Sequence, residues 1–485
     1  MINVTDIAIQ PILPLMAVVV TAIVVLLVGA FGDPEQESHY GYIGIAGLAL
    51  AAYFGLRLWN HAPFTGYGGM LLVDKLAVFS TMIFLFAAAV TFLSSPSYLS
   101  AEKRNTGEYY GLVLFAVTGM ICMVSTNHLV LFFLGLEILS ISLYALAGFV
   151  RQRPVCNEAA LKYLFLGAFA TGFLLLGMAL LYAEVSTLSL SGLVAYLKAS
   201  KTPGALFVVG LLLLFVGFFF KISAVPFHFW APDVYGGAPA PVTGFMATAA
   251  KAAAFVIILR VCMLTVFSMK GLWVPIVSIL AVLSMVVGNF TALRQENIKR
   301  MLAYSSIAHA GYVLVGVAAA TRQGASAVLF YMAAYTVMNV GAFTVVAMLG
   351  KKGESCVNVS DYAGLAAKRP LLAAAMAVFM FSLAGIPGTA GFMGKFYVFA
   401  AGLKAGQVPL VIIALINSAV AAYYYLRVVV MMYTKDPVEE FDKAIVSPGM
   451  VAAVAVTIIA VFQLGIVPHA VMASSMMSVL PWGIP

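Results

Sequence analysis

Residues 204–236 read GALFVVGLLLLFVGFFFKISAVPFHFWAPDVYG, an apolar run that contains Lys221 and, five residues later, Pro226. The run is longer than the ~20 residues that cross a bilayer as one straight helix, and a proline inside a helix removes a backbone hydrogen bond. A second long run, 370–403, contains Pro387 and Lys395. In lipid, a break survives only where protein or a wet cavity surrounds it. The two runs therefore predict a pair of discontinuous membrane helices, each with a lysine near its break.

The whole chain has the composition of a polytopic membrane protein. It has 485 residues, of which 63% are hydrophobic and only 9% are charged, whereas roughly a quarter of a soluble domain is charged. This composition excludes a soluble enzyme, a disordered chain and a nucleic-acid binder. The four cysteines have no spacing that suits zinc or an iron–sulfur cluster.

The apolar runs predict an all-α fold with about fourteen transmembrane helices. They are continuously apolar, whereas the strands of a membrane barrel alternate between polar and apolar residues. The expected helices are residues 10–31, 40–60, 73–95, 109–124, 127–150, 158–184, 204–236, 239–267, 272–293, 297–320, 324–350, 370–403, 408–434 and 448–470.

The order of the broken helices predicts an internal repeat. If the fourth to eighth helices form one unit and the ninth to thirteenth another, each broken helix is the fourth of its unit. Because a unit has an odd number of helices, the second is inverted relative to the first, and paired discontinuous helices point to an ion or substrate path. The alternative is two incidental proline kinks. The expected domains are three N-terminal helices at 1–108, a first repeat at 109–267, a second, inverted repeat at 268–434 and a C-terminal helix at 435–485.

Loop charges predict the orientation. Loops on one side, which carry residues such as Arg151 and Lys299, have more Lys and Arg than the loops on the other side. By the positive-inside rule these loops are cytoplasmic, and both termini are expected on the outer, periplasmic side of a bacterial inner membrane. Arg260 and Arg427 lie toward helix ends, where their long side chains can extend to the membrane interface, so a structural role is expected for both.

Four charged residues lie near the middle of expected helices: Glu137, Lys221, Lys251 and Lys395. Each intramembrane charge costs at least ~2.5–3.5 kcal/mol, so charges without a role are not expected there. Burial makes the charged form of a lysine costly, and a buried lysine can therefore load and release a proton. A buried carboxylate needs a partner or a proton, and Lys221 would serve Glu137 if the two are neighbours. These residues predict a proton or ion path, with inert buried pairs as the alternative.

Other titratable groups are weaker candidates for the path. His228 and His309 could relay protons because imidazole titrates near neutrality, although a hydrogen-bonded structural role suits each equally well. Lys162 follows Glu158 by one helical turn, so an ion pair between them competes with a functional role. Nothing resembles a phosphate loop, a haem ligand set or a nucleophilic triad. No catalytic residue, cofactor-binding residue or metal ligand is expected in this chain.

Several long stretches resemble one known family. They are KISAVPFHFWAPDVYGGAPAPVTGFMATAAKAAAF (221–255), QENIKRMLAYSSIAHAGYVLVG (295–316), SLAGIPGTAGFMGKFYVF (382–399) and YYYLRVVVMMY (423–433). Across residues 70–435 the chain is similar to the subunit N family, the antiporter-like membrane subunits of bacterial NADH:quinone oxidoreductase (respiratory complex I). Subunits L and M and the Mrp-type antiporters look like PDAMEGPTPVSALIHA where this chain has PDVYGGAPAPVTGFMATAAK.

The resemblance implies the same helix number, inverted repeats and a mid-membrane line of protonatable residues, matched here by Glu137, Lys221, Lys251 and Lys395. It implies a non-redox subunit of a translocase, in which quinone reduction elsewhere in the complex drives proton translocation. Quinone, FMN and iron–sulfur clusters would then belong to partner subunits. The implied partners are other antiporter-like and small helical membrane subunits, a peripheral redox arm reached through them, and the lipid bilayer. The alternatives are a subunit of an Mrp-type sodium/proton antiporter or of a membrane-bound hydrogenase, and a purely structural membrane scaffold.

Overall fold

The computed structural model describes residues 8–31, 39–200, 202–350, 354, 356–437 and 444–480. The two ends of the chain, expected on the outer side of the membrane, lie outside the described residues.

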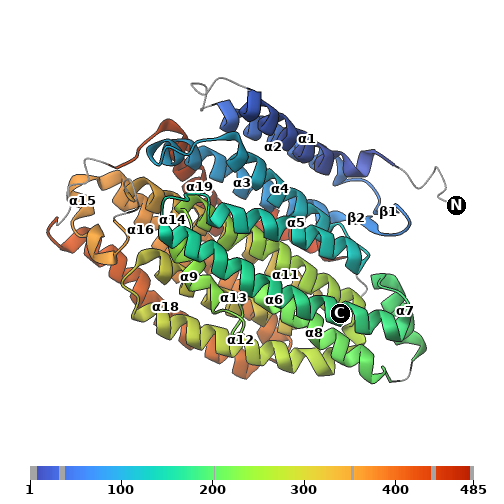
Figure 1. Ribbon diagram of the computed structural model, residues 1–485. Coiled ribbons are helices and arrows are strands. Elements are labelled where there is room, and N and C mark those ends of the chain that lie inside the picture. The colour runs from blue at the N-terminus through green and yellow to red at the C-terminus, as the bar shows by residue number, and fades with distance from the viewer. Residues whose placement is uncertain are drawn as a thin grey trace.

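The described chain is a bundle of long helices that run side by side (Figure 1). Its α-helices are α1 (Leu13–Phe31), α2 (His39–Leu58), α3 (Lys75–Ala101), α4 (Gly107–Val124), α5 (Leu129–Ala147), α6 (Pro154–Val185), α7 (Leu190–Ala199), α8 (Ala205–Lys221), α9 (Trp230–Gly237), α10 (Ala240–Phe245), α11 (Lys251–Leu259), α12 (Lys270–Leu293), α13 (Ile298–Ala318), α14 (Arg322–Leu349), α15 (Leu365–Lys368), α16 (Pro370–Ala384), α17 (Ala390–Lys404), α18 (Val408–Thr434), α19 (Pro448–Ile466) and α20 (His469–Val479). Short 3₁₀ turns lie at Gln10–Ile12, Phe267–Met269 and Val359–Tyr362, and π-helical segments at Met246–Ala250 and Arg260–Thr265. An antiparallel hairpin of two short strands, β1 (Phe64–Gly66) and β2 (Leu71–Val73), was not predicted from the sequence.

The all-α membrane fold is confirmed. Twelve described helices are long and apolar enough to cross a membrane, and one of them is the continuous stretch Ala240–Thr265 that joins α10, α11 and the two π-helical segments. Both broken helices are interrupted where the sequence predicts: Pro226 lies between α8 and α9, and Pro387 between α16 and α17. The count of fourteen crossings, with each broken pair crossing once, stays a prediction, as do the repeat boundaries.

Contacts between loops define the two ends of the bundle. At one end, which we call the hairpin end, Leu72 N donates to Ser125 O (3.1 Å) and Leu190 N donates to Asn127 O (2.8 Å). These bonds join the β1–β2 hairpin, the α4–α5 turn and the start of α7. At the other end, the α15 end, Ile298 N donates to Val357 O (2.7 Å). Figure 1 shows α7 and the hairpin at one end of the bundle and α15 at the other.

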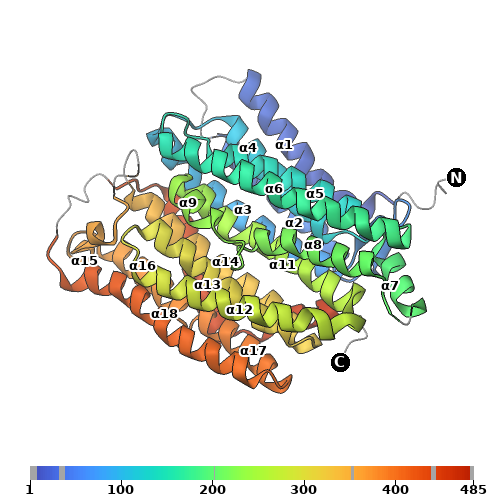
Figure 2. The ribbon, with the colours of Figure 1, turned by 60° about the horizontal axis from the view of Figure 1, so that its bottom comes forward.

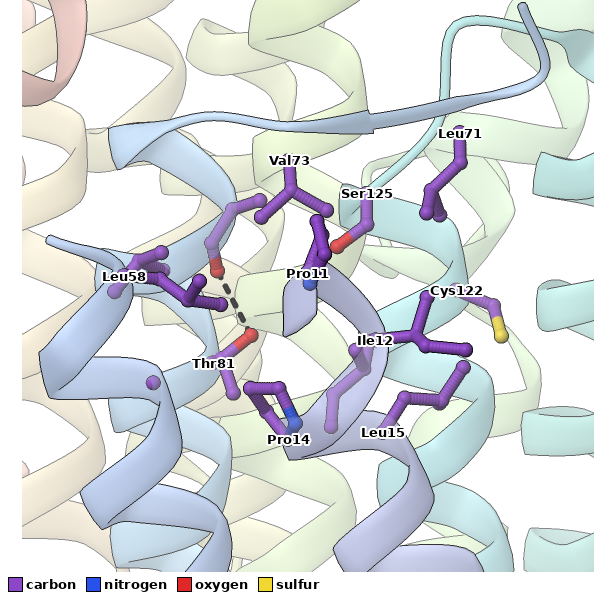
Figure 3. A pocket seen from close by; sticks show the side chains of 14 residues that line it. Pro11, Ile12, Pro14, Leu15, Leu58, Leu71, Val73, Thr81, Cys122 and Ser125 are labelled. Atoms are coloured by element: carbon purple, nitrogen blue, oxygen red, sulfur yellow. Dashed lines mark hydrogen bonds between the residues drawn. The ribbon is translucent and has the colours of Figure 1, made fainter. Parts of the chain in front are cut away.

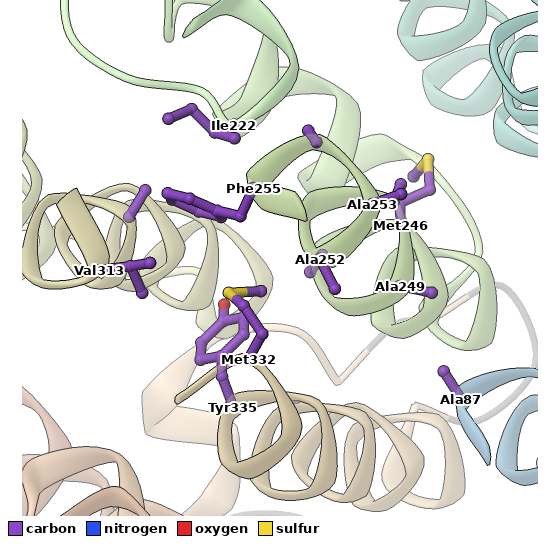
Figure 4. Packing of buried hydrophobic residues seen from close by; sticks show 14 of the residues in the cluster. Ala87, Ile222, Met246, Ala249, Ala252, Ala253, Phe255, Val313, Met332 and Tyr335 are labelled. Atoms are coloured by element: carbon purple, nitrogen blue, oxygen red, sulfur yellow. The ribbon is translucent and has the colours of Figure 1, made fainter. Parts of the chain in front are cut away.

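The helices in the middle of the bundle are the most deeply buried, and two of them carry Lys251 and His309. In Figure 2, α11, α13 and α14 run through the middle of the bundle, with α1 and α18 at opposite edges. Small residues such as Ala249 and Ala252 let α11 and the π-helical segment before it approach their neighbours closely, and Phe255, Val313 and Met332 fill the space between helices (Figure 4). A charge placed here can find polar partners only within the protein.

Candidate functional site

Lys221 is the last residue of α8, immediately before the first break. Its Nζ donates a hydrogen bond to Ser140 Oγ of α5 (2.7 Å). It also lies 5.8 Å from the ring centre of Tyr144 and 5.4 Å from that of Tyr163. Aromatic faces attract cations, so the ammonium group is held by one hydroxyl and two rings.

Glu137 lies one helical turn before Ser140 on the same face of α5. Its Oε1 accepts a hydrogen bond from Thr171 Oγ1 of α6 (3.0 Å). Among the described residues, no salt bridge within 4.0 Å joins Glu137 to any basic group. Glu137 and Ser140, the hydrogen-bond partner of Lys221, therefore share one face of α5, and no salt bridge joins Glu137 to Lys221.

Lys251 follows the first π-helical segment and is buried in the middle of the bundle. Its Nζ donates to the side-chain oxygen of Ser306 (2.5 Å) and to the backbone oxygen of the same residue (3.1 Å). The ring centre of Tyr235 lies 5.9 Å from the ammonium nitrogen. All three contacts come from neutral groups.

His309 lies one turn beyond Ser306 on α13. Its Nδ1 is 2.8 Å from the hydroxyl of Tyr331, and its Nε2 is 3.0 Å from the hydroxyl of Tyr425. The Tyr425 hydroxyl also hydrogen-bonds to Ser305. An imidazole with a hydroxyl on each nitrogen can accept a proton on one side and pass one on from the other.

Lys395 lies on α17 after the second break, and its side chain reaches back across it. The Nζ donates to the carbonyl oxygens of Leu383 (3.1 Å) and Ala384 (2.9 Å), at the C-terminus of α16, and to Ser418 Oγ of α18 (2.9 Å). It also lies 5.0 Å from the ring centre of Tyr312. A helix C-terminus carries partial negative charge, which favours a cation there.

Aromatic side chains connect these groups into one row. Tyr163, beside Lys221, stacks on Trp230 with centroids 4.5 Å apart, and Trp230 meets the ring of Tyr235, beside Lys251, at 5.8 Å. Further along, α13 presents three residues spaced one turn apart: Ser306 contacts Lys251, His309 follows, and Tyr312 lies beside Lys395. Of the candidate residues, the structure brings Lys221, Lys251, His309 and Lys395 together along this row. Its aromatic rings and Ser306 were not singled out from the sequence.

Two predicted residues lie off the row. Lys162, whose side chain is 40% exposed, pairs with Glu158 (2.7 Å) as expected and also with Asp233 (2.7 Å). His228 is buried beside the exposed ring of Phe229, and no partner for its Nδ1 occurs in the described part of the chain.

Arg260 makes structural contacts at the ends of α3 and α4. Its side chain is buried and donates two hydrogen bonds to the carboxylate of Asp74 (2.9 and 3.0 Å) and one to Val124 O (2.9 Å). Arg427 is half-buried and donates to the carbonyls of Leu293 and Gln295, just past α12. Both guanidinium groups satisfy backbone or carboxylate acceptors of neighbouring helices.

A buried charge cluster around Glu354 escaped the sequence analysis. Its carboxylate accepts from Lys299 Nζ (2.6 Å), Arg153 (2.9 Å), the Tyr98 hydroxyl (2.6 Å) and Ala240 N (2.8 Å). Burial alone would raise the pKa of Glu354, but the charges of Lys299 and Arg153 outweigh burial and lower that pKa to about 2. One carboxylate thus ties α3, α6, α10 and α13 together at the α15 end.

No group of three or more His, Cys, Asp or Glu in the described residues could hold a metal ion. A small cavity of about 30 Å³ near the start of α1 is lined by apolar side chains, with Thr81, Cys122 and Ser125 as its only polar ones (Figure 3). Thr81 Oγ1 is already bonded to Ala77 O (2.8 Å).

The fold and the site define a polytopic membrane protein of the antiporter-like class. The family described as "NADH:quinone oxidoreductase/Mrp antiporter, TM" matches residues 126–421, a range that includes both breaks and the row from Glu137 to Lys395. The NADH-quinone oxidoreductase subunit N of Trichlorobacter lovleyi is 46% identical over 95% of both chains. This chain belongs to the NADH-quinone oxidoreductase subunit N family.

Solved structures agree with this assignment. A chain of respiratory complex I from Thermus thermophilus with bound aureothin superposes with a TM-score of 0.82 at 37% identity, over 96% of this chain and 100% of that one. A chain of the Mrp complex from Dietzia has a TM-score of 0.85 over 98% of both chains, but only 18% identity, so it shows the fold alone.

Proposed function

We propose that this chain is a proton-translocating membrane subunit of an NADH:quinone oxidoreductase, and that it passes protons along the row of Glu137, Lys221, Lys251, His309 and Lys395. The names of its relatives and of the Thermus complex support membership of such a complex. The chain itself would be a non-redox part of the translocase, driven by quinone reduction in partner subunits.

The observation that carries the proposal is the surroundings of the three lysines. Lys221, Lys251 and Lys395 are only 8%, 2% and 4% exposed, and among the described residues none has a carboxylate within 4.0 Å. Hydroxyls, carbonyls and aromatic rings hold each ammonium group. Such neighbours stabilise the charged form of the lysine but do not prevent the loss of its proton. They are neutral, so none of them becomes an unpaired ion when the proton leaves.

Proton transfer needs donors and acceptors in sequence. Ser306 and the Tyr425 and Tyr331 hydroxyls can both donate and accept, and they lie between Lys251 and the Lys395 side of α13. The step between Lys221 and Lys251 passes stacked aromatic rings, so protons would cross it only with water or side-chain motion. We propose that this step controls the rate at which protons move along the path.

The remaining functional assignments follow from the family. Quinone, FMN and iron–sulfur clusters would be held by partner subunits, which include other antiporter-like and small helical membrane subunits and a peripheral redox arm. The location would be a bacterial inner membrane, with the α15 end on the cytoplasmic side and both termini outside.

The test is to reconstitute the whole complex in vesicles and to measure NADH:quinone reduction and internal acidification together. Lys251→Met should abolish acidification and lower quinone reduction in a complex that still assembles. Lys270→Met, at an exposed position at the start of α12, is the matched control and should behave like wild type. An assembled Lys251→Met complex that pumps at the wild-type rate would overturn the proposed path.

Sodium transport is the competing function. Replacing sodium in the assay by another monovalent cation should leave acidification unchanged. A strict dependence on sodium would instead favour a sodium/proton antiporter.

A further inference from the structure

A groove at the α15 end lies between the first turns of α16 and α19. Its volume is about 500 Å³. Its walls are mostly apolar, with Leu372 and Ala375 on α16 and Val454 and Ile458 on α19. None of these residues belongs to the proposed proton path.

The groove opens on an apolar face of the bundle. Leu371, at its rim, is 85% exposed, and α19 exposes Val451, Val456 and Ile459 along the same helix. In a chain that spans a membrane, an apolar surface of this kind faces hydrocarbon, where acyl chains can enter the groove from the side.

The end of the groove nearest α15 is positively charged. Lys368 and Arg369 line it, and neither has a salt bridge or side-chain hydrogen bond to another described residue. α16 begins there with Pro370, and the N–H groups of its first turn have no side-chain cap. A helix N-terminus carries partial positive charge and favours an anion. Two basic side chains without a salt bridge to the described residues thus meet a helix N-terminus at this end of the groove.

We propose that this groove binds an anionic phospholipid, with the phosphate at Lys368 and Arg369 and an acyl chain between α16 and α19. Charge complementarity selects the headgroup, because basic pockets between transmembrane helices attract anionic lipids. The apolar walls select a lipid over a soluble phosphate compound, which would leave them exposed. The bound lipid would fill the gap between α16, the first half of the second broken helix, and α19.

The experiment measures lipid binding to the whole purified complex. Delipidated complex is titrated with phosphatidylglycerol or phosphatidylcholine, and bound lipid is counted by native mass spectrometry. Lys368→Gln combined with Arg369→Gln should weaken tight phosphatidylglycerol binding about thirtyfold, since each basic group near the surface contributes about 1 kcal/mol. Lys103→Gln combined with Arg294→Gln removes two basic residues from loops expected on the same side and should leave binding unchanged.

A second variant tests the groove without changing its charge. Ala455 lines the groove from an exposed position, so Ala455→Trp should fill it and abolish the same binding event without overpacking the core. Equal binding of the two lipids by wild type, or tight phosphatidylglycerol binding that survives both the double variant and Ala455→Trp, would overturn the proposal. A photo-crosslinker placed at residue 371 that captures another subunit instead of lipid would also overturn it.

Discussion

Lys299 and Lys395 are both buried lysines, yet their surroundings differ in kind. Lys299 lies in the charge cluster at the α15 end, where its Nζ contacts Glu354 (2.6 Å) and the carbonyl of Ala238 (2.6 Å). Arg153 supports the same carboxylate from α6. Lys395 contacts two carbonyl oxygens, one hydroxyl and one aromatic ring. One lysine has a full counter-charge, and the other has only dipoles.

The difference separates a structural charge from one that can change its protonation state. Lys299 supplies part of the positive charge that offsets the burial of Glu354, so the two residues form a buried ion pair that depends on both charges. Neutral Lys395 would leave behind only carbonyl and hydroxyl groups, which lose less when the charge disappears. Ion pairs therefore connect the helices at the α15 end of the bundle. In its middle, the lysines contact only hydroxyls, carbonyls and aromatic rings.

The largest effect is expected where a full counter-charge is removed. Glu354→Gln leaves Lys299 and Arg153 buried without their carboxylate, and breaking a buried pair in this way costs about 3–5 kcal/mol. The yield of assembled complex and its thermal stability in detergent should both fall sharply. Glu158→Gln is the control, because that carboxylate is 63% exposed and pairs with Lys162 at the surface. Equal stability of the two variants would show that the cluster is not a structural clamp.

The pH dependence of this effect has a definite sign. The pKa of Glu354, about 2, lies below its ordinary value of 4.5. A lowered carboxyl pKa contributes stability that is fully present above about pH 4.5 and is lost as the pH falls toward about 2. The stability difference between wild type and Glu354→Gln should therefore stay constant from about pH 8 to about pH 6. A difference that shrinks across that range would contradict the assigned charge state.

The comparison is sharpest when the same substitution is made in both regions. Arginine keeps the positive charge but does not release its proton in proteins. Lys395→Arg should therefore assemble and lose proton pumping by at least about tenfold, since a positioned proton-transfer group commonly contributes more than that. Lys299→Arg keeps the charge that Glu354 needs and should retain pumping.

Acidification of vesicles that contain each assembled complex is the measurement for this pair. Lys404→Arg, at the exposed end of α17, controls for the added bulk of the guanidinium group. Full pumping by Lys395→Arg would place Lys395 with the structural charges.

A smaller effect is expected at Glu137. Its carboxylate does not touch Lys221, but it lies one turn from Ser140, which accepts the lysine's hydrogen bond. No salt bridge within 4.0 Å joins the two groups, so at an effective dielectric constant near 20 their attraction is below about 4 kcal/mol. Glu137→Gln should keep the shape, leave Lys221 neutral more often, and lower pumping and quinone reduction together, by about threefold to tenfold. Glu158→Gln, at the periphery, should leave both activities unchanged, and a fully active Glu137→Gln complex would remove Glu137 from the path.

The sequence predicted the broken helices and the lysines because both signals are local. A proline in an apolar run removes a backbone hydrogen bond at its own position, and a charge in the middle of such a run is costly wherever the helix packs. The proline signal alone does not decide a break, because Pro96 and Pro275 lie within α3 and α12 without ending them. The residues that contact these lysines, in contrast, lie on other helices. The sequence gives the depth of Lys221 in the membrane but not the helix rotation that brings it to Ser140. Arg260 lies toward the end of a span, but the sequence does not show that its partner is Asp74, the N-cap residue of α3.

Glu354 was missed for a related reason. It lies outside every expected helix, and its partners Arg153 and Lys299 lie at the starts of α6 and α13, far away in the sequence. Only the packing of the helices brings these residues together. The charge count of loops reveals their side of the membrane, but it does not reveal which loops meet.

The smallest effect is expected at Pro387, although the sequence alone suggests that replacing it with alanine would rebuild the helix and misplace Lys395. The break also depends on Gly385 and Gly388, whose φ angles are +92° and +86°, and an alanine at 387 leaves both unchanged. Pro387→Ala should therefore cost only about 0.4–1 kcal/mol, through the freer unfolded chain, with pumping close to wild type. Gly385→Ala is the informative partner, because a Cβ there would lie 3.3 Å from Lys395 Nζ on a backbone that favours glycine. It should displace the ammonium group from the α16 carbonyls and lower pumping in an assembled complex. If Pro387→Ala lowers pumping as much as Gly385→Ala does, the proline ring itself holds the break open, and the second broken helix depends on the residue that the sequence first singled out.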